Sequence, residues 1–298
     1  MKIEDLLVDP ISMQQLVLDQ DSGSINNLNL ELFQGKISDG IPVVLPKGAE
    51  AKPTSLHQKH DSEFDYVDHY IKDAVSSDYF QAPPEITENE RMRLNQLIIH
   101  KIKGDAKRIL DVGCGNGWLS KMLQNDRNQV VSLDISLINV KRVLQNTPHP
   151  NHSGLVADVF NLPIQSNSFD TIVASEIIEH VHDPKEFIAS LLNVLKPGGR
   201  LIISTPYNEQ IPLHLCVHCN RPTPENAHLH SFNESNIFDS IPNNAQVVDI
   251  TKSTNKHLLK LRAYMLIRSF PFNLWRLIDK LAIKLLKRPT RLILEITK

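Results

Sequence analysis

A carboxylate followed by three glycines at alternate positions marks the segment of the chain best suited to hold a small ligand. Asp111 ends a short apolar run, and Gly113, Gly115 and Gly117 follow it. The apolar run predicts a buried parallel strand, and glycines directly after it let the backbone turn sharply and approach a ligand closely. A carboxylate at this point does not suit a bound pyrophosphate. It suits a ligand that carries a cationic group.

Two further acidic residues end the next two strand-like runs. Asp134 closes the run 130–134, and Asp158 closes the run 154–158. A carboxylate at the end of the second strand can accept hydrogen bonds from both hydroxyls of a ribose. Any one of these acids could equally well be a helix-capping or turn residue. It is the occurrence of all of them at successive strand ends that indicates a nucleotide site. A nicotinamide enzyme would more often show G-x-G-x-x-G, and here the third glycine comes one residue too early.

A third constellation follows the fourth strand-like run, in the segment Ser175–Pro184. Glu176, Glu179 and His180 stand at i, i+3 and i+4, which places them on one face of a helical turn. Two carboxylates and an imidazole form a candidate divalent-cation site, where a metal would lower the pKa of a substrate hydroxyl. Without a metal, His180 is the best candidate general base. We therefore predict that His180 and Glu179 are the catalytic residues.

A cysteine pair gives a weaker metal signal. Cys216 and Cys219 have zinc-knuckle spacing in a histidine-rich loop, but one CxxC pair supplies only half of a structural site. A separate zinc would need one or two nearby histidines, and the alternative is two ordinary loop thiols. Three cysteines in the whole chain make no disulfide framework, so we expect a reducing, cytoplasmic location.

The elements that position these residues alternate between strand and helix signals. This alternation predicts an α/β fold with a Rossmann-like, seven-stranded, mostly parallel sheet. The predicted strands are 108–112, 129–134, 153–157, 170–174, 199–205, 246–251 and 290–297. We expect three parts: a small β-rich module at 1–48, a linker and helical segment at 49–104, and the main domain at 105–298. Apolar residues at helical spacing predict that 85–103 packs beside the first strand.

The C-terminal region differs sharply in charge from the rest of the chain. Residues 252–298 hold twelve Lys and Arg against two acidic residues, a net charge of +10, whereas the other residues sum to −12. We expect 252–289 to form a basic, amphipathic helical insertion before the last strand. Its leucines and its basic residues occupy different faces of the helix 273–287. The first group is Leu274, Leu277, Ile278, Leu281 and Leu285, and the second is Arg276, Lys280, Lys284 and Lys287.

Three interpretations of this insertion stay open. It is a helix packed on the sheet with a solvated face, a peripheral membrane element through 259–288, or an RNA contact. Aromatic residues clustered beside the helix, rather than between arginines, disfavour RNA stacking. The acidic main body also disfavours RNA, because phosphate binding needs a broad basic surface.

Taken in order, these motifs resemble those of the class I S-adenosylmethionine-dependent methyltransferases, in particular the methyltransferase type 11 and ubiquinone-type O-methyltransferases. The run Ser168–Ala174 is similar to the fourth strand of that family. The resemblance implies S-adenosyl-L-methionine as cofactor and a helical segment within 49–104 that covers it. The cofactor-binding residues that it implies are Asp111, Gly113, Cys114, Gly115, Gly117, Asp134, Ile135, Asp158, Val159 and Ser175.

The E-x-x-E-H pattern is similar to that of ubiquinone-type O-methyltransferases and of small-RNA 2′-O-methyltransferases. This implies Mg or Zn held by Glu176, Glu179 and His180, with His230 as the first choice for a later histidine ligand and His228 as the second. Related methyltransferases carry a similar segment without metal, so the metal-free alternative stays open.

The N-terminal segment Ser38–Pro46 resembles part of the zinc-ribbon-like module, of the tRNA methyltransferase activator type, that some methyltransferases carry or partner with. Where that module has its first metal-binding pair, this chain has Asp9-Pro-Ile-Ser12, which implies a metal-free packing or docking unit. The function expected is O-methylation of a small or lipid-linked hydroxyl compound. The alternatives are a tRNA or rRNA methyltransferase and a non-catalytic cofactor-binding partner. If the basic insertion contacts a membrane, we expect the protein to be cytoplasmic and peripheral at the inner membrane surface.

Overall fold

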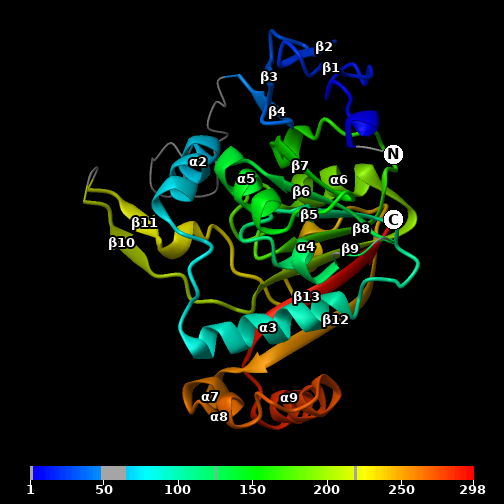
Figure 1. The fold of residues 1–298 in the computed structure, drawn as a ribbon. Coiled ribbons are helices and arrows are strands. Elements are labelled where there is room, and N and C mark those ends of the chain that lie inside the picture. Colours follow the sequence, from blue (N-terminus) through cyan, green and yellow to red (C-terminus); the bar gives the residue numbers. More distant parts are fainter. Residues whose placement is uncertain (1–2, 48–64, 124, 126, 218–219) are drawn as a thin grey trace.

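The computed structural model describes residues 3–47, 65–123, 125, 127–217 and 220–298 (Figure 1). Its centre is a nine-stranded sheet with the order β12-β13-β9-β8-β5-β6-β7-β4-β3. Five of the eight pairings are parallel, and the three antiparallel ones lie toward the two edges. The strands are β3 (Phe33–Ser38), β4 (Ile41–Pro46), β5 (Arg108–Val112), β6 (Gln129–Asp134), β7 (His152–Ala157), β8 (Phe169–Ser175), β9 (Leu195–Pro206), β12 (Gln246–Asn255) and β13 (Pro289–Thr297). The α/β fold and the seven predicted strands are confirmed.

Helices cover both faces of the sheet. The α-helices are α2 (Tyr66–Ser76), α3 (Glu85–Ile99), α4 (Trp118–Leu123), α5 (Leu137–Asn146), α6 (Pro184–Val194), α7 (Lys256–Lys260), α8 (Ala263–Leu266) and α9 (Phe272–Leu286). Short 3-10 helices are η1 (Ile3–Leu6), η2 (Val159–Asn161), η3 (Glu225–Ala227) and η4 (Ile237–Ser240). One apolar cluster joins α6 and the N-terminal segment to one sheet face. Two others join α3, α4, α5 and α9 to the opposite face.

The two faces follow from the alternation of side chains along buried strands. On β5, Leu110 and Val112 belong to the cluster with α6, whereas Ile109 packs with α3 and α9. Leu94, Leu97 and Ile98 of α3 lie in the same cluster as Ile109. The predicted packing of this segment beside the first strand is therefore confirmed.

The sheet has two strands more than the sequence predicts, because the N-terminal segment contributes a hairpin to it. Strand β4 pairs parallel with β7 through Val43↔Val156 and Val44↔Ala157, and β3 then pairs with β4. The apolar run of β4 is buried along almost its whole length, as is typical of an interior strand. A separate two-stranded sheet, β1 (Val17–Asp19) with β2 (Ser24–Asn26), lies outside it.

Asp9 fastens the N-terminal loops at the place where the resembled module would have its first metal-binding pair. Its carboxylate is fully buried and accepts backbone N–H bonds from Ile11 at 3.1 Å, Ser12 at 2.7 Å and Asn29 at 2.7 Å. Burial by itself would raise the pKa of Asp9, but the hydrogen bonds from Ser12, Asn29 and Ile11 lower it below the ordinary value. The Asp9 carboxylate thus links its own turn, residues 9–12, to the backbone at Asn29.

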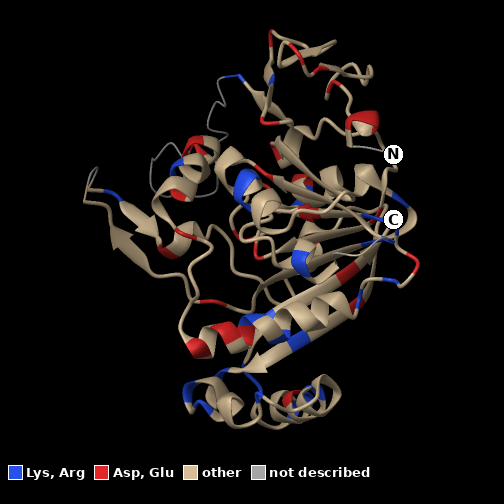
Figure 2. Cartoon of the chain, viewed as in Figure 1, with Lys and Arg blue, Asp and Glu red and all other residues tan. Residues whose placement is uncertain are grey.

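Lys and Arg positions are concentrated at one end of the molecule, in α7, α8, α9 and the end of β12 (Figure 2). Helix α9 confirms the helix predicted within the basic region and lies before the last strand, as expected. Within the described residues, no helix combines the length and the apolar character needed to cross a bilayer.

Candidate functional site

The glycine loop leaves β5 in a conformation that only glycine adopts without strain. Gly113, Gly115 and Gly117 have φ values of 66°, 49° and 73°. A Cβ on Gly113 would lie 2.2 Å from Cδ1 of Ile177, and one on Gly117 would lie 2.9 Å from Cγ1 of Val143. At Gly115 the nearest atom is a backbone oxygen 3.9 Å away. The loop therefore packs tightly at its two ends and is open at its middle glycine.

Asp111 lies under this loop as an unsatisfied buried acid. Only 2% of the residue is exposed, and its Oδ2 has no hydrogen-bond partner among the described residues. Burial, and the negative charge of Asp134, raise the pKa of Asp111 to about 8. A buried carboxyl group in this state would be stabilised by a cationic ligand.

Asp134 ends the neighbouring strand β6 and faces the same loop. Its Oδ1 accepts the backbone N–H of Ser136 at 2.9 Å, and Oδ2 lies 3.4 Å from Nδ2 of Asn139 and 3.9 Å from Sγ of Cys114. Burial raises the pKa of Asp134 and also that of Cys114, which is 1% exposed. Cys114 is therefore a protonated packing residue rather than a nucleophile.

Asp158 ends β7 and is held by α2. Its Oδ2 accepts hydrogen bonds from the Tyr66 hydroxyl at 2.9 Å and from Nδ2 of Asn161 at 2.8 Å, while Oδ1 accepts the N–H of Phe160 at 3.2 Å. The Tyr66 ring also packs against the rings of Phe160 and His182. Helix α2, and not the longer α3, is thus the helix within 49–104 that touches this acid. The role of Tyr66 could not be predicted from the sequence, because its contact with Asp158 joins residues 92 positions apart.

The remaining cofactor candidates line the same edge. Ile135 and Val159 directly follow Asp134 and Asp158 and are half-buried. The hydroxyl of Ser175, at the end of β8, lies 2.9 Å from that of Ser204 on β9. All of these residues stand at the C-terminal ends of parallel strands, where ligands of open α/β sheets bind.

The turn after β8 carries Glu176, Glu179 and His180. It packs against the glycine loop through the contact between Ile177 and Gly113. Glu179, His180 and His228 offer ligand atoms that all lie within 4.8 Å of one another. The His180 and His228 rings are 4.7 Å apart and nearly perpendicular. Burial, and the positive charge of His228, lower the pKa of His180 to about 4, so that its imidazole is neutral at pH 7.

Glu179 is the most deeply buried member of this group, with 1% exposure. Its Oε2 accepts a hydrogen bond from Thr205 at 3.0 Å, whereas Oε1 has no partner among the described residues. Burial, together with the negative charge of Glu176, raises the pKa of Glu179 well above its ordinary value. A cation at this point would relieve both effects.

Glu176, which the sequence predicts as a metal ligand, is not part of the group formed by Glu179, His180 and His228 and instead belongs to a neighbouring ion pair. Its Oε2 lies 3.0 Å from Nε of Arg291 on β13, and its Oε1 accepts a hydrogen bond from Ser204 at 3.0 Å. Its own backbone has a φ of 58°, which is strained for a residue other than glycine. Nη1 of Arg291 also lies 3.7 Å from Oε1 of Glu90. The sequence did not predict the role of Arg291, because only the sheet order β13-β9-β8 brings the start of β13 to the same edge of the sheet as the end of β8.

The structure brings His228, and not His230, to the cluster. Nε2 of His230 hydrogen-bonds to the carbonyl of Val181 at 2.9 Å, which turns its ring away. Nδ1 of His228 lies 2.5 Å from Oε2 of Glu209, leaving Nε2 of this imidazole as the atom for a ligand. The preference for His230 over His228 is therefore corrected.

The cysteine pair is described only in part. Cys216 is a half-buried cysteine beside the hairpin of β10 (Leu213–Leu215) and β11 (Pro222–Pro224). Cys219 lies outside the described residues, so the separate zinc site stays a prediction.

Comparison with known proteins identifies the central part of the chain. Residues 110–203 match the family model described as a methyltransferase domain. The chain therefore has an α/β methyltransferase fold, and its central segment resembles a methyltransferase domain. The resemblance seen in the sequence is confirmed at this level.

Curated relatives match only part of the chain. A ubiquinone biosynthesis O-methyltransferase of Xanthomonas axonopodis is 32% identical over 163 residues, which cover 52% of this chain and 64% of the relative. The protein of the same name from Xanthomonas euvesicatoria is 40% identical over 106 residues, covering 33% and 42%. A malonyl-[acyl-carrier protein] O-methyltransferase of Hahella chejuensis is 33% identical over 105 residues, covering 35% and 38%. The chain thus spans less than two thirds of each relative.

Solved structures agree on the fold. An S-adenosylmethionine-dependent methyltransferase from Mesorhizobium loti has a TM-score of 0.50 at 16% identity, covering 68% of this chain and 96% of that one. A chain of the Haloferax volcanii complex between the Trm112 methyltransferase activator and a methyltransferase also scores 0.50, at 17% identity, covering 78% and 96%. At this identity the likeness concerns the fold alone.

The family implies S-adenosylmethionine as the methyl donor, and the residues of this methyltransferase fit it. The unpartnered Oδ2 of Asp111 suits a cationic group, Gly115 is open to a close approach, and Asp134 and Asp158 present buried carboxylates at the ends of the next two strands. When bound, this cofactor supplies the electrophilic methyl group.

Proposed function

We propose that this methyltransferase catalyses O-methylation of a small or lipid-linked hydroxyl compound. The observation that carries the proposal is the group formed by buried Glu179 and half-buried His180 and His228, at the turn whose Ile177 contacts Gly113 of the glycine loop. Methyl transfer is an in-line displacement, so the protein must mainly position the acceptor oxygen and help it to lose its proton. The O-methyltransferase names of the partial relatives support the same reaction class.

The state of the group favours metal-assisted over simple base catalysis. A base whose pKa is about 4 is weak at neutral pH, whereas imidazole nitrogens and a carboxylate are suitable ligands for a divalent metal ion. A divalent ion here would lower the pKa of the acceptor hydroxyl. Glu179, His180 and Nε2 of His228 would hold it, and Glu209 would fix the orientation of His228. In the metal-free alternative, His180 accepts the proton directly.

Metal analysis of the purified protein, with Glu179→Gln and His180→Ala, tests this site. We expect either variant to lose the bound metal and at least about 100-fold in turnover, while S-adenosylmethionine binding stays unchanged. His214→Ala is the matched control, because His214 is an exposed histidine of the same region. Full activity in both site variants, with no metal in the parent protein, would contradict the role of the site.

The acceptor class is tested by incubating the protein with methyl-labelled cofactor and separate small-molecule, lipid and RNA extracts. We expect label in the small-molecule or lipid fraction, as an alkali-stable ether. Label in the RNA fraction would contradict the proposal in favour of the RNA alternative. Measured cofactor binding with no label in any fraction would favour the non-catalytic alternative.

A further inference from the structure

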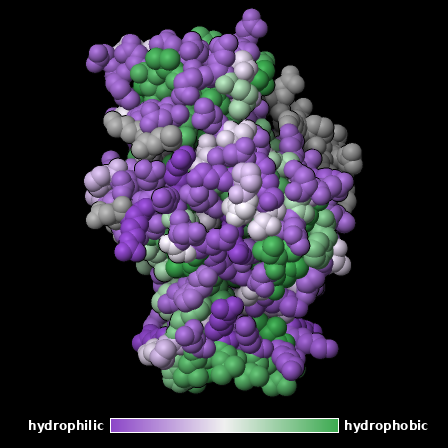
Figure 3. Space-filling view, turned by 90° about the vertical axis from the view of Figure 1, so that its right-hand side faces the viewer, coloured by the Kyte–Doolittle hydropathy of each residue, from purple (hydrophilic) through white to green (hydrophobic). Residues whose placement is uncertain are grey.

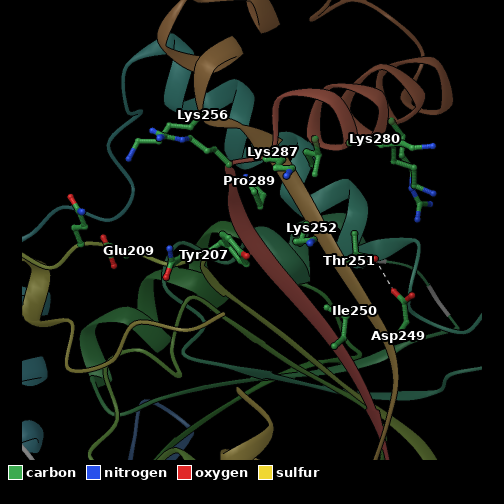
Figure 4. A pocket seen from close by; sticks show the side chains of 16 residues that line it. Tyr207, Glu209, Asp249, Ile250, Thr251, Lys252, Lys256, Lys280, Lys287 and Pro289 are labelled. Atoms are coloured by element: carbon green, nitrogen blue, oxygen red, sulfur yellow. Dashed lines mark hydrogen bonds between the residues drawn. The ribbon is translucent and has the colours of Figure 1, made fainter. Parts of the chain in front are cut away.

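A basic cleft of about 1160 Å³ opens between β12, α9 and the segment that follows β9 (Figure 4). Its charged lining is unbalanced, with two acids, Glu209 and Asp249, against seven cationic side chains. The cationic residues are Lys252, Lys256, Arg276, Lys280, Lys284, Lys287 and Arg288. Side chains from α9 and from the strand ends thus present an excess of positive charge to one cleft.

Almost none of this positive charge is neutralised within the protein. Asp249 is paired with Lys101, Glu209 is engaged by His228, and Lys252 is paired with Glu234. The other six cationic residues of the cleft form no salt bridge to any residue that the structure describes. Like charges held together in this way repel one another, and an anionic ligand would stabilise them.

The backbone holds part of this charge in place by a strained turn. Lys287 and Arg288 have φ values of 55° and 56°, a costly conformation for two consecutive residues with side chains. The N–H of Lys256 donates to the carbonyl of Arg288 at 2.9 Å. The amide of Asn255, which is fully buried, donates to the carbonyl of Lys287. Three cations are therefore presented by a fixed turn rather than by a loose tail.

The cleft borders the proposed acceptor site through one shared residue, Glu209. Tyr207 and Glu209 line it, and Glu209 also bonds to His228 of the cluster. Both regions lie at the same edge of the sheet, because β12 runs parallel to β9 through their common antiparallel neighbour β13.

Helix α9 has a third face, which is apolar and exposed. Trp275, Asp279 and Ala282 turn inward and are buried, so the sheet is not contacted by the leucine face. Leu277, Leu281 and Leu285 are 55%, 51% and 76% exposed. Further exposed apolar residues nearby are Leu261, Leu266, Phe270 and Leu274. Figure 3 shows apolar surface along the end of the molecule that α7, α8 and α9 form.

We infer that α7, α8 and α9 dock the protein on an anionic lipid bilayer and that the basic cleft receives the phosphate of a lipid headgroup. Leucines and cations on adjacent faces of one helix are the arrangement of an interfacial helix that lies in the membrane plane. A soluble phosphate or an RNA would use the cations but would leave the leucines in water. That this lipid is the methyl acceptor rests on the proposed function; the docking itself does not.

The test is co-sedimentation of the full chain with phosphatidylcholine vesicles, with and without added phosphatidylglycerol. We expect binding to the anionic vesicles, weakened by salt, and little binding to phosphatidylcholine alone. Each lysine near an anionic surface strengthens binding by about fivefold. Lys280→Gln with Lys284→Gln should therefore weaken binding by roughly 25-fold, and Leu277→Ser with Leu281→Ser should weaken it at least as much.

Two matched double variants control for composition and folding. Lys121→Gln with Lys185→Gln removes the same charge elsewhere, and Leu213→Ser with Leu215→Ser removes exposed leucines from the β10 strand. Both controls should bind vesicles like the parent protein. All variants should bind S-adenosylmethionine equally, which shows that the fold is intact.

The remaining arms identify the source of the phosphate. The inference would be overturned if the protein did not bind anionic vesicles, or if Leu277→Ser with Leu281→Ser left vesicle binding unchanged. Pyrophosphate binding in the cleft without vesicle binding would assign it to a soluble phosphate. RNA binding lost in the lysine variant, without vesicle binding, would assign it to nucleic acid. Intact vesicle binding with no methyl transfer to lipid would contradict the proposed acceptor but not the docking.

Discussion

At the scale of single residues, the site combines acids whose charge the protein itself leaves uncompensated. Asp111 and Glu179 each keep a buried oxygen without a hydrogen-bond partner among the described residues. The sequence predicted these positions, because an acid at a strand end and an E-x-x-E-H turn are local patterns. It did not predict Tyr66 or Glu209, whose contacts with Asp158 and His228 depend on the packing of distant segments.

The state of Asp111 predicts that cofactor binding is coupled to proton release. With a pKa of about 8, the free protein holds this carboxyl mostly protonated at neutral pH. A cationic group of S-adenosylmethionine favours the ionised form and lowers the pKa, so a proton leaves on binding. Affinity should therefore rise with pH until about pH 8 and then level off. Titration calorimetry in buffers of different ionisation enthalpy measures the released proton.

Asp111→Asn should abolish this proton release and weaken cofactor binding by about tenfold or more. Asp19→Asn is the control, because Asp19 is an acid of the N-terminal hairpin far along the chain from the loop. An affinity that is independent of pH and equal in Asp111→Asn would show that the carboxyl does not meet the cation.

At the scale of elements, the sequence specified the strands well and the loops poorly. Apolar runs bounded by acids, glycines or prolines predicted the strand ends. Periodicity predicted the apolar and basic faces of α9, but not the buried face of Trp275, Asp279 and Ala282. The sequence around His228 and His230 does not show which of the two histidines lies beside Glu179 and His180. The backbone N–H groups of Leu229 and His230 both bond to the carbonyl of Glu179, and this contact between loops decides which ring enters the cluster.

The glycine loop gives a graded prediction for stability. Gly115→Ala should cost about 1–2 kcal/mol, the penalty of a side chain at positive φ. Gly113→Ala should cost about 2–4 kcal/mol, because its Cβ would also overlap Ile177. Urea unfolding followed by circular dichroism measures both. Gly104→Ala, at a position with open space and no positive φ, is the control and should change little.

Combining Gly113→Ala with Ile177→Ala separates the two causes. We expect the second substitution to recover the part of the loss that comes from overlap, while the part from positive φ remains. A double variant whose loss equals the sum of the single losses would exclude the contact between the loop and the turn as the reason for glycine at 113.

At the scale of the whole molecule, the sequence predicted the methyltransferase sheet but not its extent. The first strands of the chain looked like a separate small unit, because a polar linker follows them. Yet Val44 shares one apolar cluster with Leu110 and Leu155 of the central sheet. Pairing between β4 and β7 joins segments more than 100 residues apart, and no local pattern reports such a pairing.

This shared core predicts that the N-terminal hairpin and the methyltransferase domain unfold together. Val44 is 1% exposed, so Val44→Ala should cost about 1.5–2.5 kcal/mol through lost burial and the cavity left behind. Trp118 and Trp275 pack in the cluster around α3 and α9 on the opposite face, and their fluorescence reports unfolding of the domain. We expect their transition to shift to lower urea in Val44→Ala and to coincide with the transition seen by circular dichroism. Val17→Ala, at an exposed position, should shift neither. A tryptophan transition that does not move in Val44→Ala would mean that residues 1–48 fold as an independent module, because only a shared core transmits the loss to the distant indoles.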